Sequence, residues 1–124
     1  MKIYFAHPIN TYGDQIELYA IDSINRLYPE CILINPNCPD HQDGYKRDGM
    51  SYFRKIISEC DRVVVLPFSD GSIGAGMAKE INWALRQGKK VIQLKPFEDI
   101  EEIFNLRFHR VMTVEETRTK LSGQ

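Results

Sequence analysis

The sequence predicts a single α/β domain of three layers, in which helices cover both faces of a five-stranded parallel sheet. Apolar runs of strand length alternate with helical patterns along the chain, which is typical of folds built from strand–helix–strand units. One of these runs, Val63–Leu66, is unbroken, rich in β-branched residues and followed by Pro67, as in strands buried on both faces. Right-handed crossovers between parallel strands then place helices on both sides of the sheet.

The chain opens with a predicted strand, a loop and a helix. Lys2–Ala6 is an apolar run of strand length. His7–Gly13 follows as a loop, because Pro8 disfavours helical geometry at the residue before it. Asp14 is a suitable N-cap for the next helix, whose apolar residues recur at helical spacing, and Pro29 ends that helix.

A short second strand, Cys31–Ile34, precedes the least regular part of the sequence. Asn35–Gly44 contains two prolines and several Asn and Asp residues, which indicates a long loop of the kind that often covers a binding site. A helix is predicted next, beginning at about Lys46 or Met50 and ending at Cys60, with apolar residues spaced to face the core.

The third strand, Val63–Leu66, leads through the Ser- and Gly-rich loop Ser69–Gly76 into a helix that carries Glu80 and ends at Gly88. At 100° per residue, Glu80 lies at the edge of the buried stripe, so its carboxylate can point along the top of the sheet. The positive end of the helix dipole is expected to keep it ionised, which suits a nucleophile or a base. A glutamate is also simply favoured in a first helical turn, and the helix alone leaves both interpretations open.

The remaining elements complete the predicted sheet. Lys90–Leu94 is a fourth strand, a short helix is predicted near Ile100–Asn105, and Phe108–Met112 is predicted as the fifth strand. Thr113 and Glu116 have the spacing of a capping box that starts a last helix. The expected strand order is 2-1-3-4-5, the flavodoxin-like (Rossmann-like) arrangement. In this order the loops after strands 1 and 3 meet at the switch point, where ligands bind.

Composition excludes several classes of protein. The chain has 124 residues and 14.4 kDa, which suits one domain spanning residues 1–124. Its 16 basic and 17 acidic side chains nearly balance and form no basic run, so no nucleic-acid partner is expected. No apolar stretch reaches transmembrane length, and the chain opens with a strand instead of a signal peptide. Three cysteines without a CxxC pair indicate a reduced, cytoplasmic protein, and the lack of a transmembrane stretch indicates no membrane partner.

The two loops at the switch point supply candidate ligand-binding residues. Backbone N–H groups and the Ser72 hydroxyl in the segment Ser72–Gly76 could cradle a phosphate or a sugar hydroxyl, although a plain tight turn is the alternative. The segment is not a Walker A loop, and it does not follow the first strand as a dinucleotide fingerprint does. His7, after the first strand, could donate to an anion or simply shape its turn. Substrate-binding roles are predicted for His7, Asn10, Ser72, Gly74 and Gly76.

Three further groups of polar residues have both a structural and a functional interpretation. Asp48, at a predicted helix start, is either an N-cap or a candidate acid or sugar ligand. Asp70 and Gly71 form an ordinary turn pair, which is the favoured interpretation. Cys38 and His41 have metal-like spacing, but no second pair supports a zinc site, so no metal is expected.

Several of these segments resemble the nucleoside 2-deoxyribosyltransferase family, which includes the nucleoside 5′-monophosphate N-glycosidases. The resemblance covers roughly residues 2–94, and its most specific part is Glu80 followed by the pair Gly88-Lys89. Three other segments carry the likeness: Ile3–Ala6 with Pro8, Cys60–Val65 and Ser72–Met77. The chain departs from the family at His7, where a small residue is usual, and at Ala78-Lys79, which lengthen the spacing before Glu80.

The resemblance implies an enzyme that cleaves or transfers the N-glycosidic bond of a (deoxy)ribonucleoside or its 5′-monophosphate. Glu80 would attack C1′ and form a glycosyl-enzyme ester, and Asp48 is the nearest candidate for the assisting acid. A second base or water would then accept the sugar. The resemblance implies no metal or organic cofactor and a homo-oligomer. The alternative is a non-catalytic nucleotide-binding or nucleotide-sensing module of the same fold.

Overall fold

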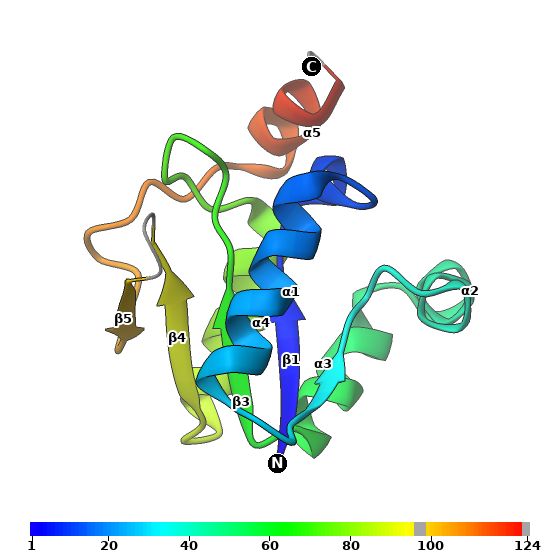
Figure 1. The fold of residues 1–124 in the computed structure, drawn as a ribbon. Coiled ribbons are helices and arrows are strands. Elements are labelled where there is room, and N and C mark those ends of the chain that lie inside the picture. Colours follow the sequence, from blue (N-terminus) through cyan, green and yellow to red (C-terminus); the bar gives the residue numbers. More distant parts are fainter. Residues whose placement is uncertain (96–98, 123–124) are drawn as a thin grey trace.

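In the computed structural model, which describes residues 1–95 and 99–122, five strands form one sheet in the middle of the molecule (Figure 1). The strands are β1 (Lys2–Ala6), β2 (Ile32–Ile34), β3 (Arg62–Val65), β4 (Lys90–Leu94) and β5 (Ile100–Ile103). The helices are the short 3-10 helix η1 (Ile9–Thr11), α1 (Gln15–Leu27), α2 (Pro39–Asp48), α3 (Met50–Glu59), α4 (Ala75–Arg86) and α5 (Val114–Ser122).

The sheet has the order β2-β1-β3-β4-β5, which confirms the predicted arrangement. β1 pairs in parallel with β2 and β3, and β3 pairs in parallel with β4. β5 runs antiparallel to β4, with Leu94 opposite Ile100 and Val91 opposite Ile103, so the prediction of five parallel strands is wrong at this edge. Only residues 95–99 join the two strands, and a parallel crossover needs a dozen or more residues.

The segment after β4 was therefore assigned incorrectly from the sequence. Ile100, Ile103 and Phe104 recur at helical spacing, which predicted a helix, but short apolar runs of this kind fit a strand equally well. Phe108–Met112, predicted as the fifth strand, is not a strand: Phe108 lies in a turn, and Val111 forms an isolated parallel bridge with Ile73.

The predicted loop Asn35–Gly44 is also partly wrong, because α2 begins inside it at Pro39. Proline is unfavourable within a helix but favourable at its first position, where no helical N–H partner is needed. Gly49, with φ of +68°, then separates α2 from α3. Gly44 faces Tyr52 of α3 so closely that a Cβ atom would overlap the tyrosine ring, which lets the two helices approach each other.

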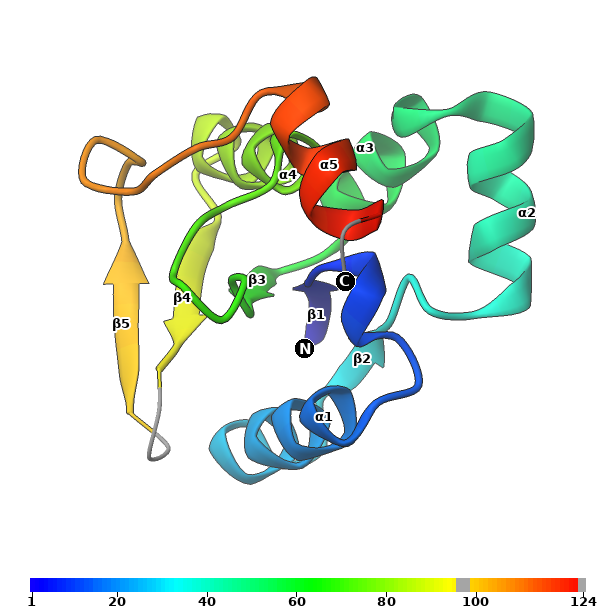
Figure 2. The same ribbon diagram turned by 90° about the horizontal axis from the view of Figure 1, so that it is seen from above.

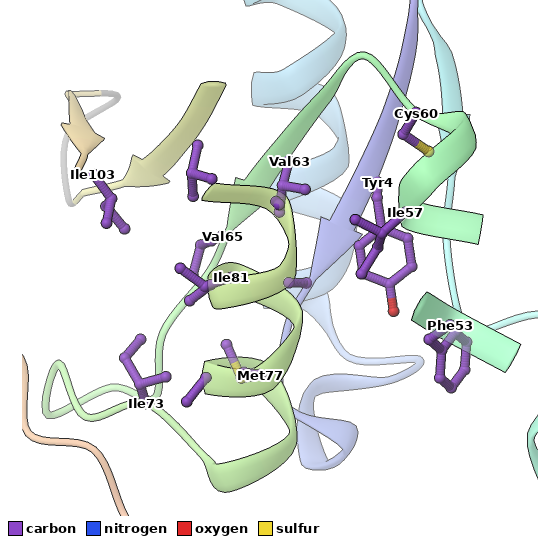
Figure 3. Close-up of a cluster of buried hydrophobic side chains, with 14 residues drawn as sticks. Tyr4, Phe53, Ile57, Cys60, Val63, Val65, Ile73, Met77, Ile81 and Ile103 are labelled. Atoms are coloured by element: carbon purple, nitrogen blue, oxygen red, sulfur yellow. The ribbon is translucent and has the colours of Figure 1, made fainter. Parts of the chain in front are cut away.

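Helices cover both faces of the sheet, as Figure 2 shows: α1 lies on one side, and α3 and α4 lie on the other. Alternate strand residues point to opposite faces and build two clusters of buried side chains. On the α1 side, Ile24 packs with Phe5 and Val64. On the opposite side, Ile57 and Ile81 pack against strand residues including Val63 and Tyr4 (Figure 3).

The last helix, α5, lies beyond the carboxyl ends of the parallel strands, above β1 and beside the start of α4 (Figures 1 and 2). Its predicted capping box is confirmed: the Glu116 N–H donates to Thr113 Oγ1 over 3.1 Å, and the Thr113 N–H donates to Glu116 Oε1 over 3.0 Å. Among the described residues, no helix has the length and apolar character needed to cross a membrane.

Candidate active site

A cavity of about 360 Å³ lies at the carboxyl ends of β1 and β3, where the sheet order predicted a ligand site. Its walls come from the end of β1, the loop around η1, the α2–α3 hairpin, the first turns of α4 and the inner side of α5. Among its lining residues are Tyr4, Tyr12, Phe53, Met77, Glu80 and Arg118. Aromatic and aliphatic surface with a few polar groups is the usual composition of a small-molecule pocket.

Glu80 lies in this cavity and is almost fully buried, with 6% of its surface exposed. The Tyr4 hydroxyl donates a hydrogen bond to Glu80 Oε2. No other hydrogen bond or ion pair engages Glu80 within residues 1–95 and 99–122, so Oε1 is left for a ligand in the cavity. In the structure, the carboxylate of Glu80 thus lies against Tyr4 of β1.

The ionisation of Glu80 differs from the sequence-based expectation. Burial raises the pKa of Glu80 to about 7, and the hydrogen bond from Tyr4 lowers it only in part. The helix dipole was expected to keep this group ionised, but its effect is confined to the first turn. α4 begins at Ala75, so Glu80 lies beyond that turn and burial dominates. At neutral pH the carboxyl group is therefore close to half ionised.

Tyr4 was treated only as a strand residue in the sequence, yet it is the direct partner of Glu80. It is 1% exposed, and its burial and the neighbouring Glu80 raise its pKa well above the usual range. The phenol thus stays protonated and acts as a donor. A buried tyrosine needs a partner for its hydroxyl, so a Tyr within an apolar strand is the sequence signal for such a contact.

Tyr12 is a second cavity residue that the sequence did not single out. Burial, followed by the nearby charges of Glu80 and Glu17, raises the pKa of Tyr12, so this phenol also stays protonated. Its hydroxyl has no hydrogen-bond partner in the part of the chain that the structure describes. A protonated phenol in the wall of a pocket can donate to a ligand.

His7 lines the cavity, but both of its ring nitrogens are engaged within the protein. Nε2 lies 2.7 Å from Glu17 Oε2, and Nδ1 lies 3.0 Å from the Phe5 carbonyl oxygen. The ring also stacks on Phe5, with centroids 3.8 Å apart. Burial lowers the pKa of His7, although the bonds to Glu17 and to the Phe5 carbonyl act in the opposite direction. The structure therefore gives His7 a role in shaping the turn, one of the two alternatives left open by the sequence.

Glu17 accepts hydrogen bonds from three residues, His7, Gly13 and Asn37, and this group is called the Glu17 clamp. The Gly13 N–H donates to Glu17 Oε1 over 3.1 Å, and the Asn37 side-chain amide donates to the same oxygen over 3.0 Å. Burial raises the pKa of Glu17, but the bonds from His7, Gly13 and Asn37 outweigh it, and the pKa lies below its ordinary value. This clamp ties the loop after β1 to α1 and to the segment after β2. Asn10, in η1 of the clamped loop, does not line the cavity, and its buried amide oxygen has no partner among the described residues.

Several polar groups of the Ser72–Gly76 turn make hydrogen bonds to other parts of the protein. Ser72 is 1% exposed, and its hydroxyl donates to Asp70 Oδ1 over 2.6 Å. Lys120 of α5 donates to the other Asp70 oxygen over 2.7 Å, and the contacts from Lys120 and Ser72 hold the pKa of Asp70 well below its usual range. Asp70 and Gly71, with φ of +85°, form a turn as predicted. Gly74 and Gly76 line the cavity, whereas Ser72 does not.

Asp48, the second predicted catalytic residue, is not brought to Glu80. A helix does begin at Met50, one of the two predicted starts, but Asp48 is the last residue of α2 instead of the N-cap of α3, and it is exposed. Its carboxylate pairs with the neighbouring Arg47 over 3.1 Å. It borders a separate surface depression with Ser51 and Lys55.

The Cys38–His41 pair shows no metal-binding arrangement. His41 Nδ1 lies 2.7 Å from the Tyr52 hydroxyl, which connects α2 to α3. Within residues 1–95 and 99–122, no group of three or more His, Cys, Asp or Glu side chains could hold a metal ion.

The solved structure of a 2-desoxiribosyltransferase from Leishmania mexicana is similar to this chain, with a TM-score of 0.52 and 16% sequence identity. The match covers 99% of this chain and 97% of that one. No protein-family model matches the sequence, and no curated protein matches it either. At this level of identity, the likeness shows that the two chains share a fold.

Proposed function

We propose that this chain is an enzyme of glycosyl transfer that breaks the N-glycosidic bond of a (deoxy)ribonucleoside or its 5′-monophosphate, with Glu80 as the nucleophile. The observation that carries the proposal is a buried carboxyl group in a pocket-lining position, held by the Tyr4 hydroxyl. A structure of the same fold is described as a 2-desoxiribosyltransferase, which supports the same class of reaction. The cavity volume of about 360 Å³ lies in the range of pockets that hold small organic ligands.

In the proposed reaction, an oxygen of the ionised Glu80 forms an ester bond to C1′ as the bond from C1′ to the base nitrogen breaks. The base leaves with the bonding electron pair and takes a proton from water. Oε1 is the oxygen assigned to the attack, because Oε2 accepts the Tyr4 hydrogen bond. In the second step, water or a second base attacks C1′, gives its proton to the hydroxide left by the first step and frees the carboxylate, so the enzyme acts as a hydrolase or as a transferase.

The raised pKa of Glu80 gives this reaction a pH signature. Only the ionised carboxylate can attack C1′, and its fraction increases with pH through about 7. Turnover is therefore expected to increase from mildly acidic toward alkaline pH, with a midpoint near 7 if attack limits the rate. A carboxylate that has left water on burial is also a stronger nucleophile than a hydrated one.

One observation favours a second function, a nucleotide-binding module without turnover. No other Asp or Glu of the described residues lines the cavity, and the ring nitrogens of His7 are engaged. The leaving base would therefore depart without a positioned carboxylic acid. A binding module would use the same pocket and the same Tyr4–Glu80 pair, with the neutral carboxyl group donating to the ligand.

The two functions are separated by following base release by mass spectrometry, using a set of common nucleosides and their 5′-monophosphates. Wild-type protein is expected to release a free base from at least one compound. Glu80→Gln and Glu80→Ala should abolish this release while circular dichroism shows a folded chain. Glu59→Gln, which changes an exposed glutamate on α3, is the matched control and should retain full activity. Near-normal turnover in either Glu80 variant would remove Glu80 as the nucleophile, and ligand binding without base release would favour the module.

The proposal also covers the oligomeric state, the cellular location and the domain organisation of the enzyme. A homo-oligomer located in the cytoplasm is predicted, with the whole of residues 1–124 acting as one domain. Two aromatic side chains after β5 are strongly exposed, Phe104 at 74% and Phe108 at 95%, and such side chains are frequent at contacts between subunits. Light scattering of the purified protein measures its oligomeric state directly.

A further inference from the structure

α5 is anchored over the cavity by contacts with the loop that leads into α4. The Ala75 N–H, at the start of α4, donates to Thr117 Oγ1 of α5 over 3.0 Å. Lys120 of α5 holds Asp70, two residues before Ser72, through a 2.7 Å ion pair. A Cβ atom on Gly74 would lie 3.2 Å from the Thr117 methyl group, so the two elements are closely packed. These contacts fix the position of Arg118, which lines the cavity.

The same contacts occupy two of the groups that the sequence assigned to an anion. The Ser72 hydroxyl is bonded to Asp70, and the first N–H of α4 is bonded to Thr117. A phosphate bound by the Ser72 hydroxyl and the Ala75 N–H would have to replace their bonds to Asp70 and Thr117. Recognition of an anionic ligand by Ser72 is therefore disfavoured in this structure.

Two cationic side chains in the cavity wall have no such internal partner. Of the charged residues that line the cavity, His7 is paired with Glu17, and Glu80 accepts from Tyr4. Lys79 of α4 and Arg118 of α5 also line it, and neither makes a hydrogen bond or ion pair within residues 1–95 and 99–122. Excess positive charge around a concave site attracts an anionic ligand.

We propose that Arg118 and Lys79 form an anion subsite that binds the phosphate of a nucleoside 5′-monophosphate, with Arg118 as the main determinant. This inference rests on the proposed function for the identity of the ligand. The planar guanidinium of Arg118 can donate two parallel hydrogen bonds to a phosphate, whereas the Lys79 ammonium acts as a point charge. Both cations also offset the repulsion between the phosphate and the ionised carboxylate of Glu80. The C-terminal helix is thus a specificity element that distinguishes nucleotides from nucleosides.

The test measures binding instead of turnover, by calorimetry with nucleoside 5′-monophosphates, the matching nucleosides and inorganic phosphate. Arg118→Gln is expected to weaken monophosphate binding about tenfold and Lys79→Gln about threefold. Both effects are modest because the two side chains are exposed and water screens their charges. Nucleoside binding should change less than about twofold, since the bond at issue involves only the phosphate. Arg86→Gln, an exposed substitution on α4 away from the cavity, is the matched control and should change neither.

A second measurement separates electrostatic recognition from damage to α5. Raising the salt concentration should weaken monophosphate binding to wild type and weaken it much less in Arg118→Gln. Equal losses for nucleoside and monophosphate in Arg118→Gln, or an unchanged affinity for the monophosphate, would overturn the subsite. Wild-type protein that binds neither monophosphates nor inorganic phosphate would overturn it as well. Selective monophosphate binding without base release would leave the subsite standing and refute the proposed reaction.

Discussion

The free energy of unfolding of Glu80→Gln, measured relative to that of wild type, is expected to increase with pH. Burial raises the pKa of Glu80 in the folded chain to about 7, whereas the ordinary value is 4.5. Below pH 4.5 both the folded and the unfolded wild type hold the proton, and the full stability is present. As the pH rises from there, the unfolded chain ionises first, which favours unfolding.

The size of this effect follows from the two pKa values. A pKa difference of one corresponds to about 1.4 kcal/mol, so the difference at Glu80 corresponds to about 3 kcal/mol of stability. This stability is lost as the pH rises and is gone once the pH has passed the folded pKa of about 7. Glutamine does not titrate, and its oxygen can still accept the hydrogen bond of Tyr4. Its buried NH₂ group adds a cost that does not vary with pH.

The assay is urea unfolding at a series of pH values, followed by the fluorescence of Trp83, the one tryptophan of the chain. The free energy of unfolding of Glu80→Gln minus that of wild type should increase by about 3 kcal/mol between mildly acidic and neutral pH and then stay constant. Glu59→Gln, at an exposed position, should show no comparable trend. A difference that is independent of pH would show that Glu80 ionises freely in the folded chain, and the reasoning from its burial would be refuted.

Three further substitutions test the surroundings of this residue. Tyr4→Phe removes the hydrogen bond that lowers the pKa of Glu80, so the acidic limb of a pH–rate profile should move upward by about one pH unit, and an unmoved limb would argue against the contact. Glu17→Gln replaces the carboxylate that accepts from His7, Gly13 and Asn37 with a neutral amide. This change should lower the free energy of unfolding at neutral pH by about 2 kcal/mol in urea titrations, whereas an unchanged stability would argue against these contacts. Asp48→Asn should change kcat/KM by less than about twofold, because Asp48 is exposed outside the cavity, and a large loss would restore it as the acid.

The parts of the fold that the sequence predicted are those with strong local patterns. The β-branched run of β3 predicted a buried strand. The strand order followed from the alternation of strands and helices. The position of Glu80 near the ligand-binding edge followed from the same pattern, because α4 comes directly after the central strand. β5 was missed because Ile100, Ile103 and Phe104 fit a helix as well as a strand, and α2 was missed because Pro39 reads as a loop residue.

The contacts that define the candidate site join residues far apart in the chain, and local patterns do not encode them. Tyr4 and Glu80 are separated by 76 residues, and Lys120 and Asp70 by 50. The sequence thus proposed Ser72 as an anion-binding residue without showing that its hydroxyl would donate to Asp70 and that α5 would contact Asp70 and Ala75. It placed Asp48 at a helix start, where the chain in fact ends one helix and begins another.

Burial of Glu80 and the cations of the cavity wall are two parts of one electrostatic arrangement. Removing a carboxyl group from water makes the folded chain less stable at neutral pH, and the sheet and α4 hold it there through Tyr4. An anionic ligand entering the cavity would raise the pKa of Glu80 further and suppress the ionised form that the proposed reaction requires. Lys79 and Arg118 act against this effect, because a cation near the phosphate reduces the field at the carboxylate. Under the proposed function, an ionised Glu80 beside a bound phosphate therefore requires cations in the cavity wall, and α4 and α5 carry Lys79 and Arg118 there.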